Sequence, residues 1–170
     1  MTPWNLLKTE DIDQAVTILG GRLRPPDLVI APDGEPYLYR WYVLPRRKVK
    51  ANIYLHLQVG SDPERPLHDH PWDNTSVILA GGYMELLTDM PGKLPARRYM
   101  RREGDVVYRK ATTAHRLFLP SWNRYTMTLF TTGPVVRQWG YWTDEGWVDE
   151  HDLTKTLADG TSVFTGKLDE

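Results

Sequence analysis

Three histidines carry the strongest chemical signal in this chain of 170 residues. His68 and His70 are separated by a single aspartate, and His115 follows further downstream. Alternate residues of a β-strand point to one face, so both members of the H-x-H pair can reach the same metal ion if this segment is extended. A third imidazole from another strand would complete a facial set. His68, His70 and His115 are therefore the predicted metal ligands.

The donor atoms of this set limit which ions it can hold. The sequence has no cysteine, which excludes a thiolate site, a disulfide and a cysteine nucleophile. Neutral imidazoles suit first-row metals, and three of them on one face of an octahedral ion leave positions open for a substrate and for dioxygen or water. We expect one divalent ion, with Fe2+, Zn2+, Ni2+ and Mn2+ as candidates. Zinc would instead activate water for hydrolysis or hydration.

Polar residues near the three histidines have further predicted roles. Asp73 would supply an oxygen ligand if the loop before it bends back toward the ion, and Asn74 would supply at most a weak or water-mediated contact. Tyr108 is a candidate acid or hydrogen-bond donor. Arg124 is a candidate clamp for a substrate carboxylate. Packing and surface roles are the alternative interpretation of both catalytic candidates.

The two other histidines are interpreted as structural. His56 lies on the polar face of an expected strand, and His151 lies in an acidic segment. An H-x-H pair also arises by chance in surface or hydrogen-bonded positions. The metal interpretation therefore depends on His115 joining the pair in three dimensions.

Mostly short strands are expected to position these side chains. Thr9 can cap a helix over about 9–20, which Gly20-Gly21 ends. From about residue 28 to 150, short alternating segments are separated by turns rich in Gly and Pro, and Gly81-Gly82 is one expected turn. The expected strands are 28–31, 37–44, 52–59, 76–79, 83–87, 97–100, 106–109, 115–119, 125–131 and 137–142. This pattern favours an antiparallel sandwich or barrel.

The expected strand 52–59 has the clearest alternation in the chain. Its apolar face consists of Ile53, Leu55, Leu57 and Val59, and its polar face consists of Asn52, Tyr54, His56 and Gln58. An antiparallel sheet often packs one face on the core and leaves the other in contact with water. We expect one face to be core and the other to be partly wet.

Length and charge limit the domain organisation and the partners. A chain of this length favours a single domain over 1–170, with a barrel over about 28–150 and a loosely attached polar tail over about 151–170. The 21 basic and 22 acidic side chains nearly balance, so we expect no nucleic acid and no membrane as partner. No secretion signal or spanning segment is visible, and a cytoplasmic location is expected. The expected partner is a small-molecule substrate.

The histidine motifs resemble those of the cupins, which are small double-sheet jelly-roll barrels. The first cupin motif has a glycine, H-x-H, a glutamate three or four residues later, and a glycine. The matching residues are Gly60, His68, His70 and one of Gly81 or Gly82. The glutamate position falls on Asn74 or Thr75. In the second motif, the segment 104–115 keeps the spacing and places His115 at the family's histidine, although Lys110 replaces a proline and Thr112 a glycine.

This resemblance implies an all-β fold, a double-stranded β-helix of the jelly-roll or cupin type, with one short N-terminal helix. The run His68 to Trp72 and the segment Gly81-Gly82-Tyr83 are similar to an uncharacterised bacterial and phage subgroup. The three-histidine set resembles the iron sites of thiol and diketone dioxygenases. It implies oxidation of a small, carboxylate-bearing molecule by dioxygen, and similar proteins suggest a homodimer.

Two other functions stay open at this point. One is a metal-free sugar-nucleotide epimerase or isomerase, in which a histidine and a tyrosine act as base and acid. That mechanism requires His70 or His115 to be hydrogen-bonded to a carboxylate instead of binding an ion. The other is a non-catalytic cupin that binds a small molecule or serves in assembly.

Overall fold

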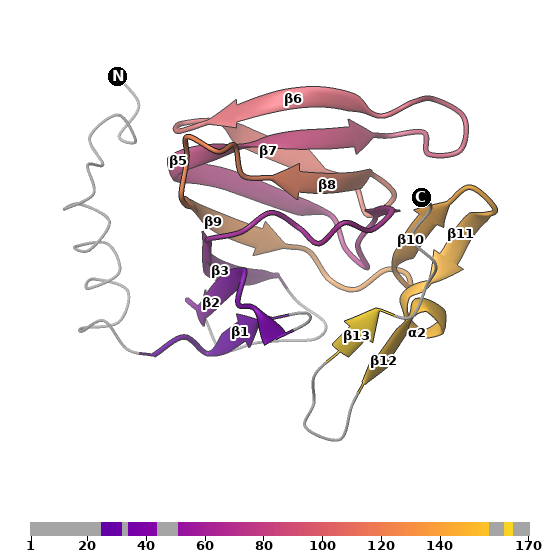
Figure 1. Ribbon diagram of the computed structural model, residues 1–170, viewed down its shortest axis with the longest axis horizontal. Helices are drawn as coiled ribbons and strands as arrows, with labels where there is room; N and C mark the ends of the chain where they lie inside the picture. The colour runs from indigo at the N-terminus through magenta and orange to yellow at the C-terminus, as the bar shows by residue number, and fades with distance from the viewer. Residues whose placement is uncertain (1–24, 32–33, 44–50, 157–161, 165–170) are drawn as a thin grey trace.

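The computed structural model describes residues 25–31, 34–43, 51–156 and 162–164, and the predicted helix over 9–20 lies outside them. Most of the described strands form two antiparallel sheets that share one long strand, and a separate two-stranded sheet lies near the C-terminus (Figure 1). The first sheet contains β1 (Leu28–Ile30), β2 (Leu38–Tyr42), β3 (Asn52–Gln58), β9 (Thr126–Thr132), the first part of β5 (Asn74–Thr88) and β7 (Val106–Arg109). The second contains the rest of β5, β6 (Arg97–Arg102), β8 (Ala114–Phe118), β4 (Leu67–His68), β10 (Gly140–Thr143) and β11 (Gly146–Asp149).

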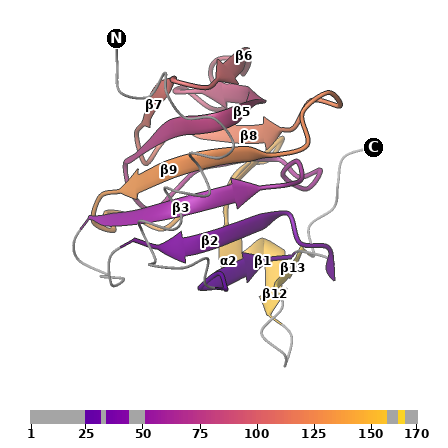
Figure 2. The same cartoon turned by 90° about the vertical axis from the view of Figure 1, so that its left-hand side faces the viewer.

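The order of strands fits the fold class predicted from the sequence. Figure 2 shows β2, β3, β9 and β5 lying side by side across the first sheet. β1 and β2, consecutive in the chain, pair antiparallel with each other. The predicted all-β jelly-roll class is confirmed. The single-domain organisation stays a prediction.

The Gly81-Gly82 pair is not the turn that the sequence suggested. β5 runs through it without a break, pairing with β9 up to Gly81 and with β6 from Gly82 onward. Gly81 has a φ of +73°, and a Cβ there would lie 2.3 Å from the Tyr125 carbonyl oxygen. A Cβ on Gly82 would lie 2.5 Å from the Arg101 carbonyl oxygen. The two glycines therefore permit close backbone approach where the strand passes from one sheet to the other.

The two faces of β3 differ in burial. Its polar face is buried, including Tyr54, His56 and Gln58, whereas Ile53 and Leu57 of the apolar face are only partly buried. On the apolar face, Leu55 packs in a cluster with Leu79, Ala80 and Met127. On the polar face, His56 stacks on Phe130 of β9, and Trp72 of the loop after β4 packs against Phe130. Alternation alone gives the two faces of a strand and cannot tell which is covered.

A second apolar cluster joins the two sheets. Ile78 and Tyr83 of β5 pack with Val107 of β7, and Leu117 and Leu119 lie against them. Ile78 and Tyr83 lie on either side of the glycine pair in β5. This cluster forms an apolar core between the sheets.

The described part of the C-terminal segment has regular structure. α2 (Glu150–Leu153) follows β11 directly, and β12 (Thr154–Thr156) pairs antiparallel with β13 (Ser162–Phe164). The loosely attached tail over 151–170 stays a prediction. No helix within the described ranges is long and apolar enough to cross a membrane.

Candidate metal centre

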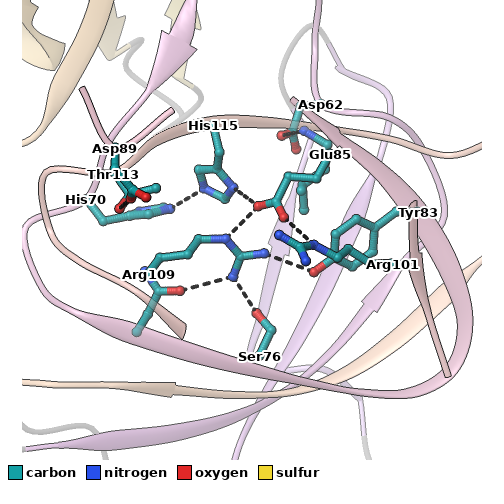
Figure 3. Close-up of polar contacts among 12 residues, drawn as sticks. Asp62, His70, Ser76, Tyr83, Glu85, Asp89, Arg101, Arg109, Thr113 and His115 are labelled. Carbon is teal, nitrogen blue, oxygen red and sulfur yellow. Dashed lines mark hydrogen bonds and ion pairs between the residues drawn. The ribbon is translucent and has the colours of Figure 1, made fainter. Parts of the chain in front are cut away.

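The structure brings the three predicted histidines together. His68 ends β4 and pairs directly with His115 of β8, while His70 lies in the loop that follows β4. One ring nitrogen from each residue lies within 4.8 Å of the others. The Nε2 atoms of His70 and His115 are 2.8 Å apart, and the dashed line between the two rings in Figure 3 marks this contact. His115 is buried, whereas His68 and His70 keep partly exposed surfaces.

This arrangement fits a divalent ion held by nitrogen. Adjacent ligands of an octahedral ion with bonds of about 2.1 Å lie about 3 Å apart, close to the separation of the His70 and His115 nitrogens. Burial lowers the pKa of His68 and of His70 well below the usual value, and the neighbouring His115 lowers both further. Both imidazoles are therefore neutral at pH 7, as metal ligands must be.

Glu85 fixes the orientation of the His115 ring. Its buried Oε1 lies 3.0 Å from His115 Nδ1, on the opposite side of the ring from the nitrogen that faces His70. Donation of the Nδ1 proton to this carboxylate leaves Nε2 as the ring atom with a free electron pair for a metal. Arg109 donates to the same oxygen over 2.6 Å, and Arg101 donates to Oε2 over 2.7 Å.

The Glu85 carboxylate stays ionised in this environment. Burial by itself would raise its pKa, but the hydrogen bond from His115 and the charge of Arg109 more than offset that effect and lower the pKa. Arg109 is itself buried, and its other nitrogens donate to Asn74 Oδ1, Ser76 Oγ and Tyr83 Oη. Figure 3 shows these contacts as one continuous network that ends at His70. The network holds His115 through a rigid, charged support.

Asp69 anchors the backbone between the two histidines of the H-x-H pair. Its carboxylate is fully buried and accepts hydrogen bonds from the indoles of Trp142 and Trp147, at 3.2 and 2.9 Å. Arg137 pairs with it over 2.6 Å, and the Gly140 amide donates to its other oxygen. The hairpin of β10 and β11 is thereby attached to the segment that carries His68 and His70. The sequence alone gives no indication of this role for Asp69.

The other predicted site residues lie elsewhere. Tyr108 is 60% exposed and donates its hydroxyl to Asp73 Oδ2, while Asp73 Oδ1 accepts from the Ala111 amide. Asp73 does not belong to the metal-ligand cluster found among the described residues. Arg124 is exposed in the loop before β9. Asn74 is buried, but its carbonyl oxygen accepts from Arg109. The catalytic roles of Tyr108 and Arg124 stay predictions without support from this placement.

The two histidines outside the set differ from each other. His151 is exposed, with 80% of its side chain accessible, as expected. His56 is buried and accepts a hydrogen bond from Arg40 Nε over 2.8 Å. Its ring stacks on Phe130 at 4.8 Å between centroids. His56 therefore has specific partners on the covered face of β3.

Glu85 and Arg109 were not predicted from the sequence, although Glu85 carries a signal in hindsight. Glu85 stands two residues after Tyr83 in the otherwise largely apolar segment 77–87, on the face that Tyr83 shares. A lone acid in such a position needs a buried partner. The partners come from β6, β7 and β8, and strand pairing at that range is not visible in the sequence.

Comparisons with known proteins find similarity among solved structures. No protein-family model matches the sequence, and a search of curated proteins finds no match. Among solved structures, a cupin 2 conserved barrel domain protein from Rhodopseudomonas palustris is 12% identical, with a TM-score of 0.49 over 76% of this chain and 78% of that chain. A protein of unknown function with a cupin-like fold from Ralstonia eutropha is 16% identical, with a TM-score of 0.49 over 71% of this chain and 68% of that chain.

A third similar structure is FeII HppE. It is 14% identical, with a TM-score of 0.48 over 76% of this chain and 78% of that chain. At these identities and TM-scores, none of the three assigns a reaction or a residue role to this chain. The solved structures to which this chain is similar include cupins, the family that its histidine motifs resemble.

Proposed function

We propose that this protein is a metal-dependent enzyme in which His68, His70 and His115 hold one divalent ion. The observation that carries the proposal is the convergence of three ring nitrogens within 4.8 Å, one of them oriented by a buried carboxylate. Networks of this kind, in which a carboxylate receives the second ring proton of a ligating histidine, are common at protein metal sites. Fe2+ is the favoured ion.

The leading reaction is oxidation of a small, carboxylate-bearing molecule. Bound Fe2+ would supply the chemistry with dioxygen, whereas Zn2+, Ni2+ or Mn2+ would supply Lewis-acid chemistry. The chain contributes three imidazole nitrogens and no carboxylate, so its ligand atoms leave the ion's double positive charge uncompensated. Two arginines contact the single carboxylate behind His115, which adds to the positive potential. Both features favour an anionic substrate. The homodimer and the cytoplasmic location stay predictions.

Metal content tests this proposal directly. Protein purified without a nickel column should contain close to one equivalent of a divalent metal by elemental analysis. His68→Ala and His115→Ala should each retain less than about a tenth of that metal, because two imidazoles cannot hold the ion as three do. His151→Ala is the matched control and should keep the full content, since this histidine is exposed. Equal metal in all four proteins would contradict the proposal.

Oxygen consumption separates the ion from the reaction. Iron-loaded protein should consume dioxygen with at least one member of a panel of small carboxylates, and the zinc-loaded protein should not. Stoichiometric metal without any oxygen consumption would leave the metal centre in place and remove the oxidation proposal.

One contact favours a second candidate function, a metal-free epimerase or isomerase. That mechanism needs a histidine hydrogen-bonded to a carboxylate, and His115 Nδ1 lies 3.0 Å from Glu85 Oε1. In this role His115 would accept a proton at Nε2 while Glu85 balances the charge on the ring. Protein stripped of metal with a chelator would then keep its full activity, whereas the metal-dependent enzyme would lose it and regain it when Fe2+ is restored.

A further inference from the structure

β7 is an edge strand of the first sheet. Within the described residues it pairs with β5 alone, and Figure 2 shows it beyond β5, at the end of the sheet away from β1. Val107 and Arg109 are buried, whereas Val106 is 63% and Tyr108 is 60% exposed. Edge strands are often protected from further pairing by Pro or Lys, and the four residues of β7 include neither. This edge therefore presents two large exposed side chains and no residue that blocks pairing.

The backbone groups of Val106 and Tyr108 point away from β5. Ile78 N donates to Asp105 O over 3.0 Å, so Asp105 directs its carbonyl toward β5. The direction alternates from one residue to the next in an antiparallel ladder, which turns the N–H and C=O groups of Val106 and Tyr108 to the open edge. In the part of the chain that the structure describes, no other strand pairs with these groups. They are available to one further strand.

The two ends of β7 carry opposite charges. Glu103 and Asp105 are exposed just before the strand, and Lys110 is exposed just after it. Arg102 belongs to β6, on the other side of the turn. Antiparallel pairing of this strand with a copy of itself brings each acidic end to a basic end, whereas parallel pairing would bring like charges together. The strand is therefore self-complementary in the antiparallel direction only.

We propose that the β7 edge binds the β7 edge of a second copy of this chain, antiparallel, about a twofold axis at Val107. In this register Val106 of each copy lies opposite Tyr108 of the other, and the two residues exchange their outward N–H and C=O groups. An aromatic residue and a β-branched residue form a favourable cross-strand pair. Because the axis relates the two copies, each contact occurs twice, and the assembly closes as a dimer.

The same register brings the charges of the two copies together. Lys110 lies opposite Gly104 of the second copy, between the second copy's Glu103 and Asp105. A Cβ built on Gly104 has no atom within 4 Å, so the Lys110 side chain can approach from the open side. These charges stay near solvent and serve to select the direction of pairing. The dimer goes beyond the proposed function and does not require a bound metal.

Sedimentation velocity over a range of protein concentrations tests this pairing. An interface built on one edge strand is small, so the native protein should pass from the 19.7 kDa monomer to a dimer of twice that mass between about 1 and 100 µM. Val106→Pro removes an outward N–H and spares the ladder with β5, and it should weaken dimerisation at least about tenfold. Lys110→Glu puts a third acid beside Glu103 and Asp105 and should weaken dimerisation about tenfold as well.

Charge reversal provides a matched control and a rescue. Lys93 is exposed in a turn elsewhere, and Lys93→Glu should dimerise as the native protein does. Combining Glu103→Lys with Lys110→Glu exchanges the two charges and should restore part of the affinity that Lys110→Glu loses. Thermal melting identifies any variant that fails to fold. If Val106→Pro fails, the variants at Lys110 decide the test, because that side chain is exposed.

Two outcomes would overturn the inference. A native protein that remains monomeric at about 1 mM would show that the second copy is not the partner of this edge, even if another protein pairs with it. Equal dimerisation of Lys110→Glu and Lys93→Glu, without rescue by the exchanged charges, would place the contact between copies on a different surface.

Discussion

The His115 ring has a defined partner on each side. Nε2 faces His70, and Nδ1 faces a carboxylate that two arginines hold in place. The carboxylate decides which ring nitrogen carries the proton, and this fixes the nitrogen available to a metal. Glu85 is a positioning residue in this arrangement, since it acts through His115.

Replacing the Glu85 carboxylate should weaken metal binding. In Glu85→Gln the affinity for Zn2+ should fall about 10- to 100-fold, because an uncharged amide supports the ligating tautomer poorly. Competition against a chromogenic chelator measures the change. Glu103→Gln, an exposed substitution with the same loss of charge, should leave the affinity unaltered. A Zn2+ affinity equal in the two variants would show that Glu85 only supports the fold.

His56 should make stability depend on pH. Its pKa is lowered in the folded protein, whereas in the unfolded chain it titrates near 6.5. Below about pH 6.5 the unfolded state therefore binds more protons, and the free energy of unfolding falls as pH falls, by up to about 1.4 kcal/mol per pH unit. His56→Gln keeps an acceptor for Arg40 and should remove this contribution to the pH dependence of the free energy of unfolding. Urea titrations at several pH values between 7 and 5 measure that dependence. The exposed substitution His151→Gln should leave the slope as in the native protein.

Long-range strand pairing builds the site from separate elements. β4 supplies His68 and β8 supplies His115, and these two residues are direct partners across the ladder. β5 supplies Glu85 and continues into both sheets, so the support behind His115 depends on the path of that strand. The β10–β11 hairpin is attached to Asp69, which fixes the segment between His68 and His70.

The glycine in the middle of β5 should tolerate no side chain. Gly81→Ala places a Cβ 2.3 Å from the Tyr125 carbonyl oxygen at a positive φ, so steric overlap adds to backbone strain. We expect a loss of about 3 kcal/mol in the free energy of unfolding, measured by denaturant titration. Gly104→Ala has a φ of +88° but no atom within 4 Å of the added Cβ. It should cost only about 1 kcal/mol. Equal losses would contradict the close approach at Gly81.

At the scale of the whole molecule, the two sheets enclose a region that is apolar in one part and polar in another. Ile78, Tyr83 and Val107 form the apolar part. The polar part contains the three histidines, where Trp72 stacks on His70 and the Glu85–Arg109 pair contacts His115. Because the candidate ligands come from separated segments, an ion at this site would link the segments and stabilise the fold as a whole.

Metal should therefore raise the melting temperature. At free Zn2+ 100 times the dissociation constant, binding to the folded state alone contributes about 2.7 kcal/mol. For a domain of this size the corresponding rise in Tm is about 5–10 °C. Differential scanning fluorimetry should show this rise in the native protein and almost none in His115→Ala. A similar rise in both would place the stabilising ion somewhere else.

Much of the fold and the centre of the candidate site were predictable from the sequence. Alternation, together with Gly and Pro turns, located most strands, and the spacing of His68, His70 and His115 selected three side chains that the structure brings together. The alternation and the H-x-H pair are local features, because alternate side chains of a strand point to the same face. His115 was selected by its position in the second motif.

Only the tertiary structure decided which strand faces are buried, where Gly81 lies and which polar side chains point inward, since each of these depends on which strands pair. The polar face of β3 is buried because residues distant in sequence cover it. Gly81 lies within a strand because two sheets share that strand. Tyr108 points to solvent and Glu85 inward because of pairing with β5 and β8. The sequence by itself determined the donor set, and long-range pairing determined the residues that orient and surround it.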